Sequence, residues 1–388
     1  MSYMTKPKIL LPGQSIGILG AGQLGKMLAQ SAQKMGYRVH MLDEKEACGF
    51  AVSHQSMISE FSDKEAVVEF GRQCDVLTYE FENIDGDILS ELEQQINLPQ
   101  GADFLLTTQH RQYEKDWLSQ LEVPTVAYEV VRSVDTLAQA LKAAQWQAVV
   151  KTVRFGYDGK GQVLIQSEAD FHKQLDKLKS LLEQQPLIVE GFCEFAYEAS
   201  VIVARDQWGT IETFPPTINE HRQGILAASY THDWSEQPEV FAQLRYYSYR
   251  IAGAAELVGV CGIEFFVLDS GDVLVNELAP RPHNTGHLTI ESCNVSQFDQ
   301  HILAITGRRL VPIQPLSPAV SVNILGQHIE QLPELIEQTP DVLIHLYDKG
   351  EAKTGRKMGH ITQLCSSEEG AADWLDNVFM SQWLEAFE

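Results

Sequence analysis

The chain has 388 residues, of which 44% are hydrophobic, and its formal net charge is −24. This length is enough for two or three packed domains, and so acidic a chain is a poor partner for nucleic acid or an anionic membrane. No stretch of about 18 apolar residues occurs, so we expect no transmembrane helix, and the N-terminus lacks the apolar core of a signal peptide. The cysteines are scattered without a CxxC pair, which indicates free thiols in a reducing, cytoplasmic compartment; they are Cys48, Cys74, Cys193, Cys261, Cys293 and Cys365.

Residues 15 to 110 alternate short apolar runs with amphipathic stretches. We expect strands at 15–19, 37–42 and 75–79 and a helix at 24–35. This βαβ pattern predicts a parallel sheet with crossover helices. A domain boundary is expected near Pro99–Gly101 or in the helix predicted for 107–121.

Between the first strand and the first helix lies the glycine turn Gly20-Ala-Gly22-Gln-Leu-Gly25. Its setting suits a dinucleotide fingerprint, and Asp43 follows at the end of the second strand, near the place of a ribose-binding acid. The motif alone leaves three interpretations open: NAD binding, binding of another phosphate ligand, or tight packing.

From about 122 to 310 the pattern changes to α+β, with strands at 148–151, 163–165 and 187–189. The helix predicted for 168–185 is preceded by Ser167, with Asp170 as its capping partner. A glycine-rich loop, Arg154-Phe-Gly-Tyr-Asp-Gly-Lys-Gly161, follows the first of these strands. Such a loop folds over a triphosphate, donating backbone N–H groups, although no Walker motif is present; the alternative is an ordinary hairpin turn.

Two glutamates on a predicted hairpin carry the strongest chemical signal. The strands 262–268 and 273–278 flank the turn Asp269-Ser-Gly-Asp272. If Ser270 and Gly271 are the central turn residues, Glu264 lies directly opposite Glu277, with Cβ atoms roughly 5 Å apart. Facing carboxylates repel unless a hard cation lies between them. The alternative is two glutamates on a solvated face.

Polar residues follow this hairpin closely, and prolines stiffen the segment that bears them: Arg281, His283, Asn284, Thr285 and His287. The last part of the chain, from about Pro312, is expected to form a small β-rich module with strands at 319–325 and 343–347. It contains a basic cluster suited to a phosphomonoester, for which a solvated turn is the alternative; the cluster is Lys349, Lys353, Arg356 and Lys357.

In this order, these features resemble the ATP-grasp superfamily. Five strings resemble, more narrowly, its 5-(carboxyamino)imidazole ribonucleotide synthases: GILGAGQLGKML (17–28), YEFENI (79–84), FGYDGKGQ (155–162), NELAPRPHNTGH (276–287) and GRKMGHI (355–361). The resemblance implies an α/β and α+β fold with three domains: a Rossmann-like domain at 1–110, an ATP-grasp domain at 111–311 and a small β-rich domain at 312–388. It also implies a homodimer that carboxylates 5-aminoimidazole ribonucleotide with ATP and bicarbonate in purine biosynthesis, releasing ADP and phosphate through carboxyphosphate.

The resemblance further assigns roles residue by residue. Glu264 and Glu277 would hold Mg²⁺, with Mn²⁺ as the alternative ion. The residues expected around ATP are Arg111, Lys151, Gly156, Tyr157, Asp158, Gly159, Lys160, Gly161, Gln162, Glu190, Gly191, Phe192, Cys193, Glu198, His221, Asn276 and Glu277. Those expected to act in the reaction are Asp158, Arg281, His283, Asn284, Lys349 and Arg356; those expected around the substrate are Gln23, Leu24, Glu80, Tyr157, Lys160, Arg281, Thr285 and Lys357.

Three points of this assignment stay open. In a regular strand, Asn276 and Glu277 face opposite sides, which leaves the role of Asn276 unsettled. The sequence also does not decide which lysine of the basic cluster grips the phosphate. Finally, other activities remain as rivals: a formate-dependent glycinamide ribonucleotide transformylase, a biotin-dependent carboxylase subunit, an NAD-dependent oxidoreductase or a non-catalytic nucleotide sensor.

Overall fold

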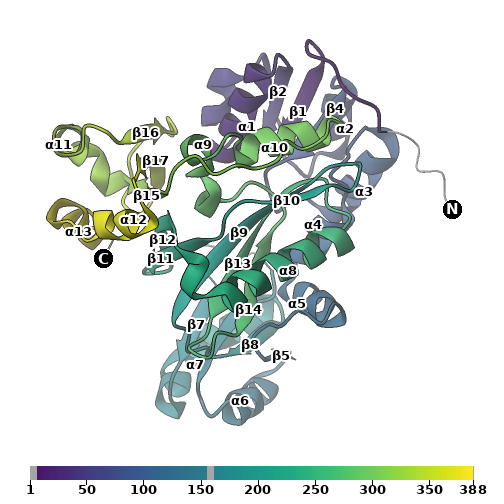
Figure 1. The fold of residues 1–388 in the computed structure, drawn as a ribbon. Coiled ribbons are helices and arrows are strands. Elements are labelled where there is room, and N and C mark those ends of the chain that lie inside the picture. Colours follow the sequence, from purple (N-terminus) through teal and green to yellow (C-terminus); the bar gives the residue numbers. More distant parts are fainter. Residues whose placement is uncertain (1–6, 155–160, 388) are drawn as a thin grey trace.

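The computed structural model describes residues 7–154 and 161–387 (Figure 1). Within these ranges the strands form three sheets, of four, nine and four strands. The N-terminal part lies at the top of Figure 1, the small sheet with its helices at the bottom, and the C-terminal part at the left. No helix in these ranges is long and apolar enough to cross a membrane.

The N-terminal sheet is parallel, as predicted, with strand order β3-β2-β1-β4. Its core strands are hydrophobic on both faces because helices cover them. Gly20 has a φ of +101°, and a Cβ on Gly25 would lie 2.4 Å from the carbonyl oxygen of Gly20, so both glycines are needed for the turn. The elements are β1 (Ser15–Leu19), α1 (Gln23–Lys34), β2 (Arg38–Asp43), η1 (Cys48–Val52), β3 (Gln55–Ile58), α2 (Lys64–Arg72), β4 (Val76–Tyr79) and α3 (Gly86–Gln95).

The helix predicted for 107–121 is wrong as a single element. The structure has α4 (Asp103–Thr108) and α5 (Arg111–Gln120), separated by the extended residue His110. The break lets the amide of Arg111 donate to the carbonyl of Val153, and it turns the Gln109 side chain toward the backbone of Glu82 and Ile84. These long-range hydrogen bonds replace the ones that a continuous helix would make.

The small antiparallel sheet has strand order β5-β8-β6-β7 and carries two helices. The predicted cap is confirmed, since the Ser167 side chain accepts from the Asp170 amide at the start of the second helix. The elements are β5 (Tyr128–Val131), α6 (Val134–Ala143), β6 (Ala148–Thr152), β7 (Gln162–Ile165), α7 (Glu168–Gln184) and β8 (Leu187–Gly191).

The large sheet has order β14-β13-β9-β11-β12-β15-β17-β16, with β10 paired to β9. The strands of the last part of the chain therefore extend the central sheet through the β12–β15 pair, rather than forming a sheet of their own. The strands are β9 (Tyr197–Arg205), β10 (Ile211–Thr213), β11 (Thr217–Arg222), β12 (Ile225–Thr231), β13 (Gly259–Val267), β14 (Val273–Ala279), β15 (Ala319–Leu325), β16 (Leu343–Leu346) and β17 (Lys357–Leu364).

The remaining helices cover this sheet or flank its C-terminal end (Figure 1). They are η2 (Trp234–Glu236), α8 (Pro238–Ala254), η3 (Asn284–Gly286), α9 (Thr289–Ser292), α10 (Gln297–Ile305), η4 (Gly326–Gln331), α11 (Leu332–Gln338), α12 (Glu368–Leu375) and α13 (Val378–Glu385). Helix α10 packs against α1, and Ser31 donates to Asp299 across this contact at 2.8 Å. The parallel domain is thereby fixed to the end of the central part.

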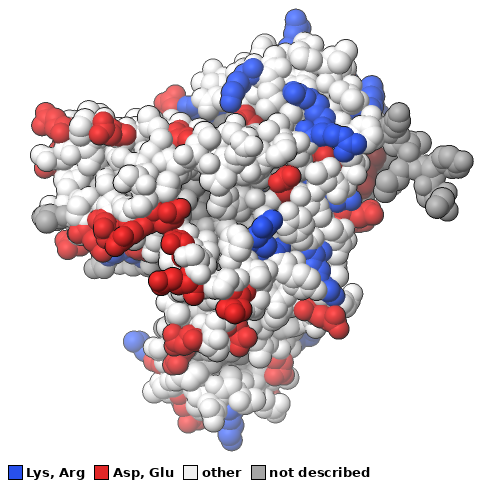
Figure 2. Space-filling model, in the orientation of Figure 1, with Lys and Arg blue, Asp and Glu red and all other residues white. Residues whose placement is uncertain are grey.

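Charge is unevenly spread over the surface. On the face in Figure 2, acidic side chains gather on the C-terminal part at the left, and basic side chains lie mainly over the N-terminal part at the upper right. All six cysteines are free thiols, as expected.

Candidate active site

The hairpin β13–β14 brings Glu264 opposite Glu277, as predicted, but not through the predicted turn. Near the turn, Val267 pairs with Val273 and Phe265 with Val275, one residue out of the expected register. A β-bulge between Glu264 and Phe265 then restores the expected pair. The bulge has a second consequence, because Asn276 and Glu277 both line the same cavity instead of facing opposite sides.

This nucleotide-sized cavity has a volume of about 500 Å³ and lies between the two antiparallel sheets. It gathers most of the described residues that the sequence assigned to ATP, metal and reaction. Those that line it are Arg111, Lys151, Gly161, Gln162, Phe192, Glu198, His221, Glu264, Asn276, Glu277, Arg281, His283, Asn284 and Lys357. The glycine-loop predictions at Gly156, Tyr157, Asp158, Gly159 and Lys160 lie outside the described residues.

A buried ion-pair cluster supports one wall. Lys151 Nζ lies 2.6 Å from Glu190 Oε2, and Lys115 Nζ lies 3.3 Å from Glu190 Oε1. Burial alone would raise the pKa of Glu190, but the two lysines outweigh it and hold the pKa below its usual value. Glu190 is thus an anchor for Lys151, while Phe192 of the same segment lines the cavity; Gly191 and Cys193 do not line it.

Two histidines in the cavity differ in electrostatic setting. His221 Nδ1 lies 2.6 Å from Glu198, and this contact raises the pKa of His221 although burial opposes it. Burial and the charge of Arg281 hold the pKa of His283 well below its usual range, so its imidazole is neutral. His283 Nδ1 bonds the hydroxyl of Thr285 at 2.9 Å, so buried Thr285 supports His283 rather than lining the cavity.

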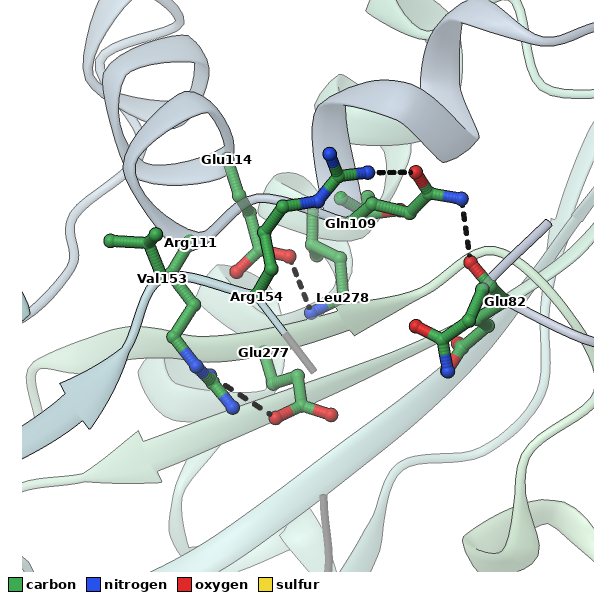
Figure 3. Close-up of a pocket in the computed structure, with 10 residues that line it drawn as sticks. Glu82, Gln109, Arg111, Glu114, Val153, Arg154, Glu277 and Leu278 are labelled. Atoms are coloured by element: carbon green, nitrogen blue, oxygen red, sulfur yellow. Dashed lines mark hydrogen bonds and ion pairs between the residues drawn. The ribbon is translucent and has the colours of Figure 1, made fainter. Parts of the chain in front are cut away.

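Carboxylates crowd around Glu277. Figure 3 shows Arg111 and Glu277 pointing toward one another, with Arg111 Nη1 3.6 Å from Glu277 Oε2. Burial, followed by the charge of Glu277, raises the pKa of Glu264 to about 7 and that of Glu114 to about 8. A divalent cation between Glu264 and Glu277 would offset this unfavourable ionisation. Such an ion binds through one or two carboxylates and the substrate's phosphates. Among the described residues no group of three or more His, Cys, Asp or Glu could hold a metal ion.

A second cavity, of about 560 Å³, lies between the glycine turn and the loop before β17. Lys349 and Arg356 line it together with Gly22, Asp43 and Cys48. Burial, followed by the neighbouring Arg356 and Lys357, lowers the pKa of Lys349 to about 8, although Cys48 opposes this. Lys353 is instead exposed and paired with Glu351 at 3.4 Å.

Gln23 lines neither cavity, but it links a residue of the first, Asn284, to a residue of the second, Lys349. Its amide nitrogen donates to Asn284 Oδ1 at 3.3 Å, and its amide oxygen accepts from Lys349 Nζ. Beside it, Glu80 accepts from the Gly22 amide at 2.9 Å, and burial raises the pKa of this carboxyl. The side chain of Leu24, however, is 6% exposed and packs in the hydrophobic core, so it lines neither cavity.

The glycine turn is not arranged for a dinucleotide. The amide of Ala21 donates to Asp43 Oδ2 at 2.8 Å, and the amide of Gly22 donates to Glu80. A dinucleotide would need these N–H groups for its pyrophosphate and Asp43 for its ribose. Here the N–H of Ala21 is bonded to Asp43 itself, and that of Gly22 to Glu80.

Sequence reasoning missed several residues of the site. Lys115 follows Arg111 by one helical turn on α5, a spacing that could have been noticed. Glu82 follows Glu80 by two residues and lies 3.0 Å from Arg281. Nothing local marks Glu114, or the stacked pair Phe195 and Phe266, whose rings lie 4.7 Å apart on the wall of the first cavity.

Comparison with known families supports the arrangement of three parts. The family described as "Ribonucleotide synthetase preATP-grasp domain" matches residues 14–109, "ATP-grasp domain" matches 116–298, and "Phosphoribosylaminoimidazole carboxylase C-terminal domain" matches 319–373.

Individual relatives match over nearly the whole chain. The N5-carboxyaminoimidazole ribonucleotide synthase of Bacillus subtilis (strain 168) is 40% identical over 385 residues, 97% of each chain. The synthase of Staphylococcus aureus (strain MRSA252) is 39% identical over 354 residues, covering 91% of this chain and 93% of its own.

Solved structures agree. An ADP complex of an N5-carboxyaminoimidazole ribonucleotide synthetase has a TM-score of 0.91 and 38% identity, covering 97% of this chain and 99% of its own. The Aspergillus clavatus synthase, in complex with ADP and 5-aminoimidazole ribonucleotide, has a TM-score of 0.88 and 26% identity, covering 97% and 100%. These matches confirm the resemblance that the motifs indicated. They exclude the rival interpretation of the chain as an NAD-dependent oxidoreductase. The chain belongs to the N5-carboxyaminoimidazole ribonucleotide synthase family of ATP-grasp ligases.

Proposed function

We propose that the protein carboxylates the exocyclic amine of 5-aminoimidazole ribonucleotide, using ATP and bicarbonate and releasing ADP and phosphate. The observation that carries this proposal is the pair of cavities whose residues Asn284 and Lys349 are both hydrogen-bonded to Gln23. One presents opposed carboxylates and cations suited to ATP, and the other presents Lys349 and Arg356, suited to the ribonucleotide's phosphate. A synthase of known structure from this family holds ADP and 5-aminoimidazole ribonucleotide together.

A bicarbonate oxygen attacks the γ-phosphorus and ADP leaves, giving carboxyphosphate; its C–O bond to the phosphate then breaks, yielding carbon dioxide and phosphate. The substrate amine forms the new C–N bond to carbon and loses a proton. By resemblance, Asp158 would accept this proton. The neutral imidazole of His283 and the guanidinium of Arg281 line the cavity and would bind the anionic bicarbonate and carboxyl groups.

Glu264 and Glu277 would hold Mg²⁺, with Mn²⁺ as the alternative; the ion supplies neutralisation of phosphate charge. Lys151, fixed by Glu190, and Arg111, fixed by Glu277, would add positive charge from the protein itself. Lys349 rather than Lys353 is the proposed phosphate lysine, because it lines the second cavity with Arg356.

Three further properties are proposed with the function: a homodimer and domain limits at 1–110, 111–311 and 312–388, which rest on the resemblance, and a cytoplasmic location, which rests on the cysteines. The scattered free thiols are in keeping with that location.

The test is an ADP-release assay with each acceptor and each one-carbon source in turn. ADP release that requires both 5-aminoimidazole ribonucleotide and bicarbonate is expected. Release with glycinamide ribonucleotide and formate, or with biotin and bicarbonate, would instead establish one of the other ATP-grasp ligases. Turnover with no acceptor at all would remove the proposed substrate.

A further inference from the structure

Glu82 lies on the loop after β4 and grips Arg281, a residue from the segment after β14. Arg281 Nε lies 3.0 Å from Glu82 Oε1, and Arg281 Nη2 donates to Glu82 Oε2 at 3.1 Å. Both carboxylate oxygens therefore face one edge of the guanidinium, the bidentate arrangement that fixes its plane as well as its position. Both side chains are partly buried and line the nucleotide-sized cavity.

The loop that carries Glu82 is itself held. The side-chain amide of Gln109 donates to the carbonyl oxygens of Glu82 and Ile84, each at 2.7 Å, and its own oxygen accepts from Arg154 Nη2 (Figure 3). Gln109 sits in the break between α4 and α5, so the broken helix is what directs it to this loop. Glu82 therefore presents its carboxylate from a fixed backbone.

The contacts of Arg281 leave part of its donor set available. A guanidinium has five N–H donors. Besides the two toward Glu82, one from Nη1 goes to the carbonyl of Pro282 at 2.9 Å. Within the described part of the chain these contacts leave two N–H groups, whose directions follow from the plane that Glu82 sets.

The charge of Glu82 is unfavourable for binding in itself. The cavity must take ATP and bicarbonate, both anions, and it already contains Glu198, Glu264 and Glu277. A fourth carboxylate weakens the attraction for these anions, and it partly cancels the charge of Arg281. Its presence is explained by orientation of the guanidinium rather than by added affinity.

We propose that Glu82 is the positioning residue for Arg281, fixing the guanidinium plane so that its two remaining N–H groups meet the carboxyl oxygens of the one-carbon unit. This rests on the proposed function for the identity of that unit. N–H donors that are already oriented stabilise the charge that develops in the transition state. Misplacing such a group by about 1 Å lowers the rate on the order of 100-fold.

The first test is the steady-state kinetics of Glu82→Gln, with Glu82→Asp as the conservative variant. Glu82→Gln should lower kcat between about 10- and 100-fold, with the KM for bicarbonate and for ATP changed less than about threefold. Glu82→Asp keeps the charge and should recover part of kcat. Glu91→Gln, which removes the partner of Lys64 on the surface, is the matched control and should match the unmodified protein. A kcat of Glu82→Gln within threefold of normal, or a loss confined to KM, would overturn the proposal.

The second test is chemical rescue, which also covers poor folding of Glu82→Gln. Guanidinium chloride at millimolar concentration should restore activity severalfold to Arg281→Ala, because Glu82 can still hold the added cation. It should restore none to the double variant Glu82→Gln/Arg281→Ala, which leaves neither charge unpaired and is therefore expected to fold. Equal rescue of both variants would overturn the positioning role. If the unmodified protein releases ADP only with a different acceptor, the proposed substrate fails, and the same comparisons made with that acceptor still decide the role of Glu82.

Discussion

Glu277 influences more of the candidate site than its single carboxylate suggests. It faces Glu264 across the hairpin, pairs with Arg111, and contributes to the raised pKa values of Glu264, Glu82 and Glu114. Burial and this neighbouring charge thus make ionisation of the surrounding carboxyls unfavourable without a ligand. The cost is offset when a cation with its phosphates is bound, which makes Glu277 the most direct residue for testing the metal assignment.

Replacing this residue should separate catalysis from folding. Glu277→Gln keeps the side-chain shape and should lower ADP release by about 100-fold or more, because neutralisation of phosphate charge is worth several kcal/mol. The circular dichroism spectrum and Tm should remain close to those of the unmodified protein, since the change relieves repulsion from Glu264. Full activity in this variant would end the assignment of the hairpin to a cation.

The basic cluster offers a matched pair of residues for the phosphate grip. Arg356→Ala should raise the KM for the ribonucleotide on the order of tenfold or more, because a charged hydrogen-bond partner is lost, and should leave the KM for ATP nearly unchanged. Lys353→Ala should change neither, because Lys353 is exposed and paired with Glu351. Steady-state kinetics with each substrate varied gives both constants; an equal rise in the two KM values would contradict the division into two cavities.

Lys349 should make binding of the ribonucleotide's phosphate depend on pH. Burial lowers its pKa to about 8, so the ammonium is charged below that pH and is lost as pH rises through it. A phosphomonoester is already dianionic there, since its second pKa is about 6. The KM for the ribonucleotide should therefore rise about tenfold per pH unit above pH 8. Lys349→Arg should flatten this rise, because arginine stays charged. A flat profile for the unmodified protein would show that Lys349 does not carry the grip.

For single residues, the sequence predicts which side chains belong to the site better than it predicts what they contact. The facing of Glu264 and Glu277 is confirmed, yet it depends on the bulge between Glu264 and Phe265, which no local pattern predicts. The same bulge places Asn276 in the cavity. Lys115 and Glu82 escape notice for another reason: their partners, Glu190 and Arg281, lie 75 and 199 residues away, and only the fold brings them together.

Among the elements, the segment after β16 supports Lys349, which lines the second cavity. Tyr347 is buried, its ring lies 5.4 Å from Lys349 Nζ, and its hydroxyl bonds His360 Nδ1 at 2.8 Å. His360 belongs to β17 and packs against His287 and His345, with ring centroids 4.6 Å away in each case. The last strands of the sheet thus place one aromatic ring, that of Tyr347, beside the proposed phosphate lysine, and the ring of His360 supports it.

Two variants separate the ring of Tyr347 from its hydroxyl. Tyr347→Leu removes the cation–π contact, worth about 0.5–2 kcal/mol, and should raise the KM for the ribonucleotide several-fold. Tyr347→Phe keeps the ring and should leave that KM unchanged, but it leaves buried His360 without its partner and should lower Tm. Kinetics and thermal unfolding of both variants check this. A raised KM in Tyr347→Phe would mean that the hydroxyl, and not the ring, supports Lys349.

Elements that repeat a clear pattern are predicted well, and those decided by distant contacts are not. The strand at 15–19 and the cap at Ser167 follow from the local sequence and are confirmed. The break at His110 interrupts a sequence that reads as helix throughout, because Gln109 and Arg111 bond to other parts of the chain. Strand β15 is likewise visible in the sequence, but its pairing with β12, which joins the last part to the central sheet, is not.

For the whole molecule, the packing of apolar side chains divides the chain differently from its domains. One buried cluster contains Leu10 and Ile16 from the N-terminal part, Phe298 and Ile302 from α10, and Tyr347 from the C-terminal part. The small sheet, by contrast, has a separate core whose members all lie between Val131 and Val189. Parts that share a core are expected to unfold together, and a part with its own core can unfold separately.

Two equivalent truncations of buried side chains, one in each core, test this division. Ile302→Ala and Leu178→Ala each truncate a fully buried side chain, one in the shared core and one in the core of the small sheet, and each should cost about 3 kcal/mol. In scanning calorimetry, Leu178→Ala should lower only the transition of the small sheet, and Ile302→Ala only the transition of the rest. If both variants lower one common transition by the same amount, the small sheet unfolds with the whole molecule. In that case the contacts between the small sheet and the central sheet, across the nucleotide-sized cavity, are strong enough without ligand to couple them.

The nucleotide-sized cavity lies between the small sheet and the central sheet, so bound ADP should contact both sheets. If the small sheet unfolds separately, ADP should therefore raise the transition temperature of the small sheet, and the rise should follow the logarithm of the ADP concentration.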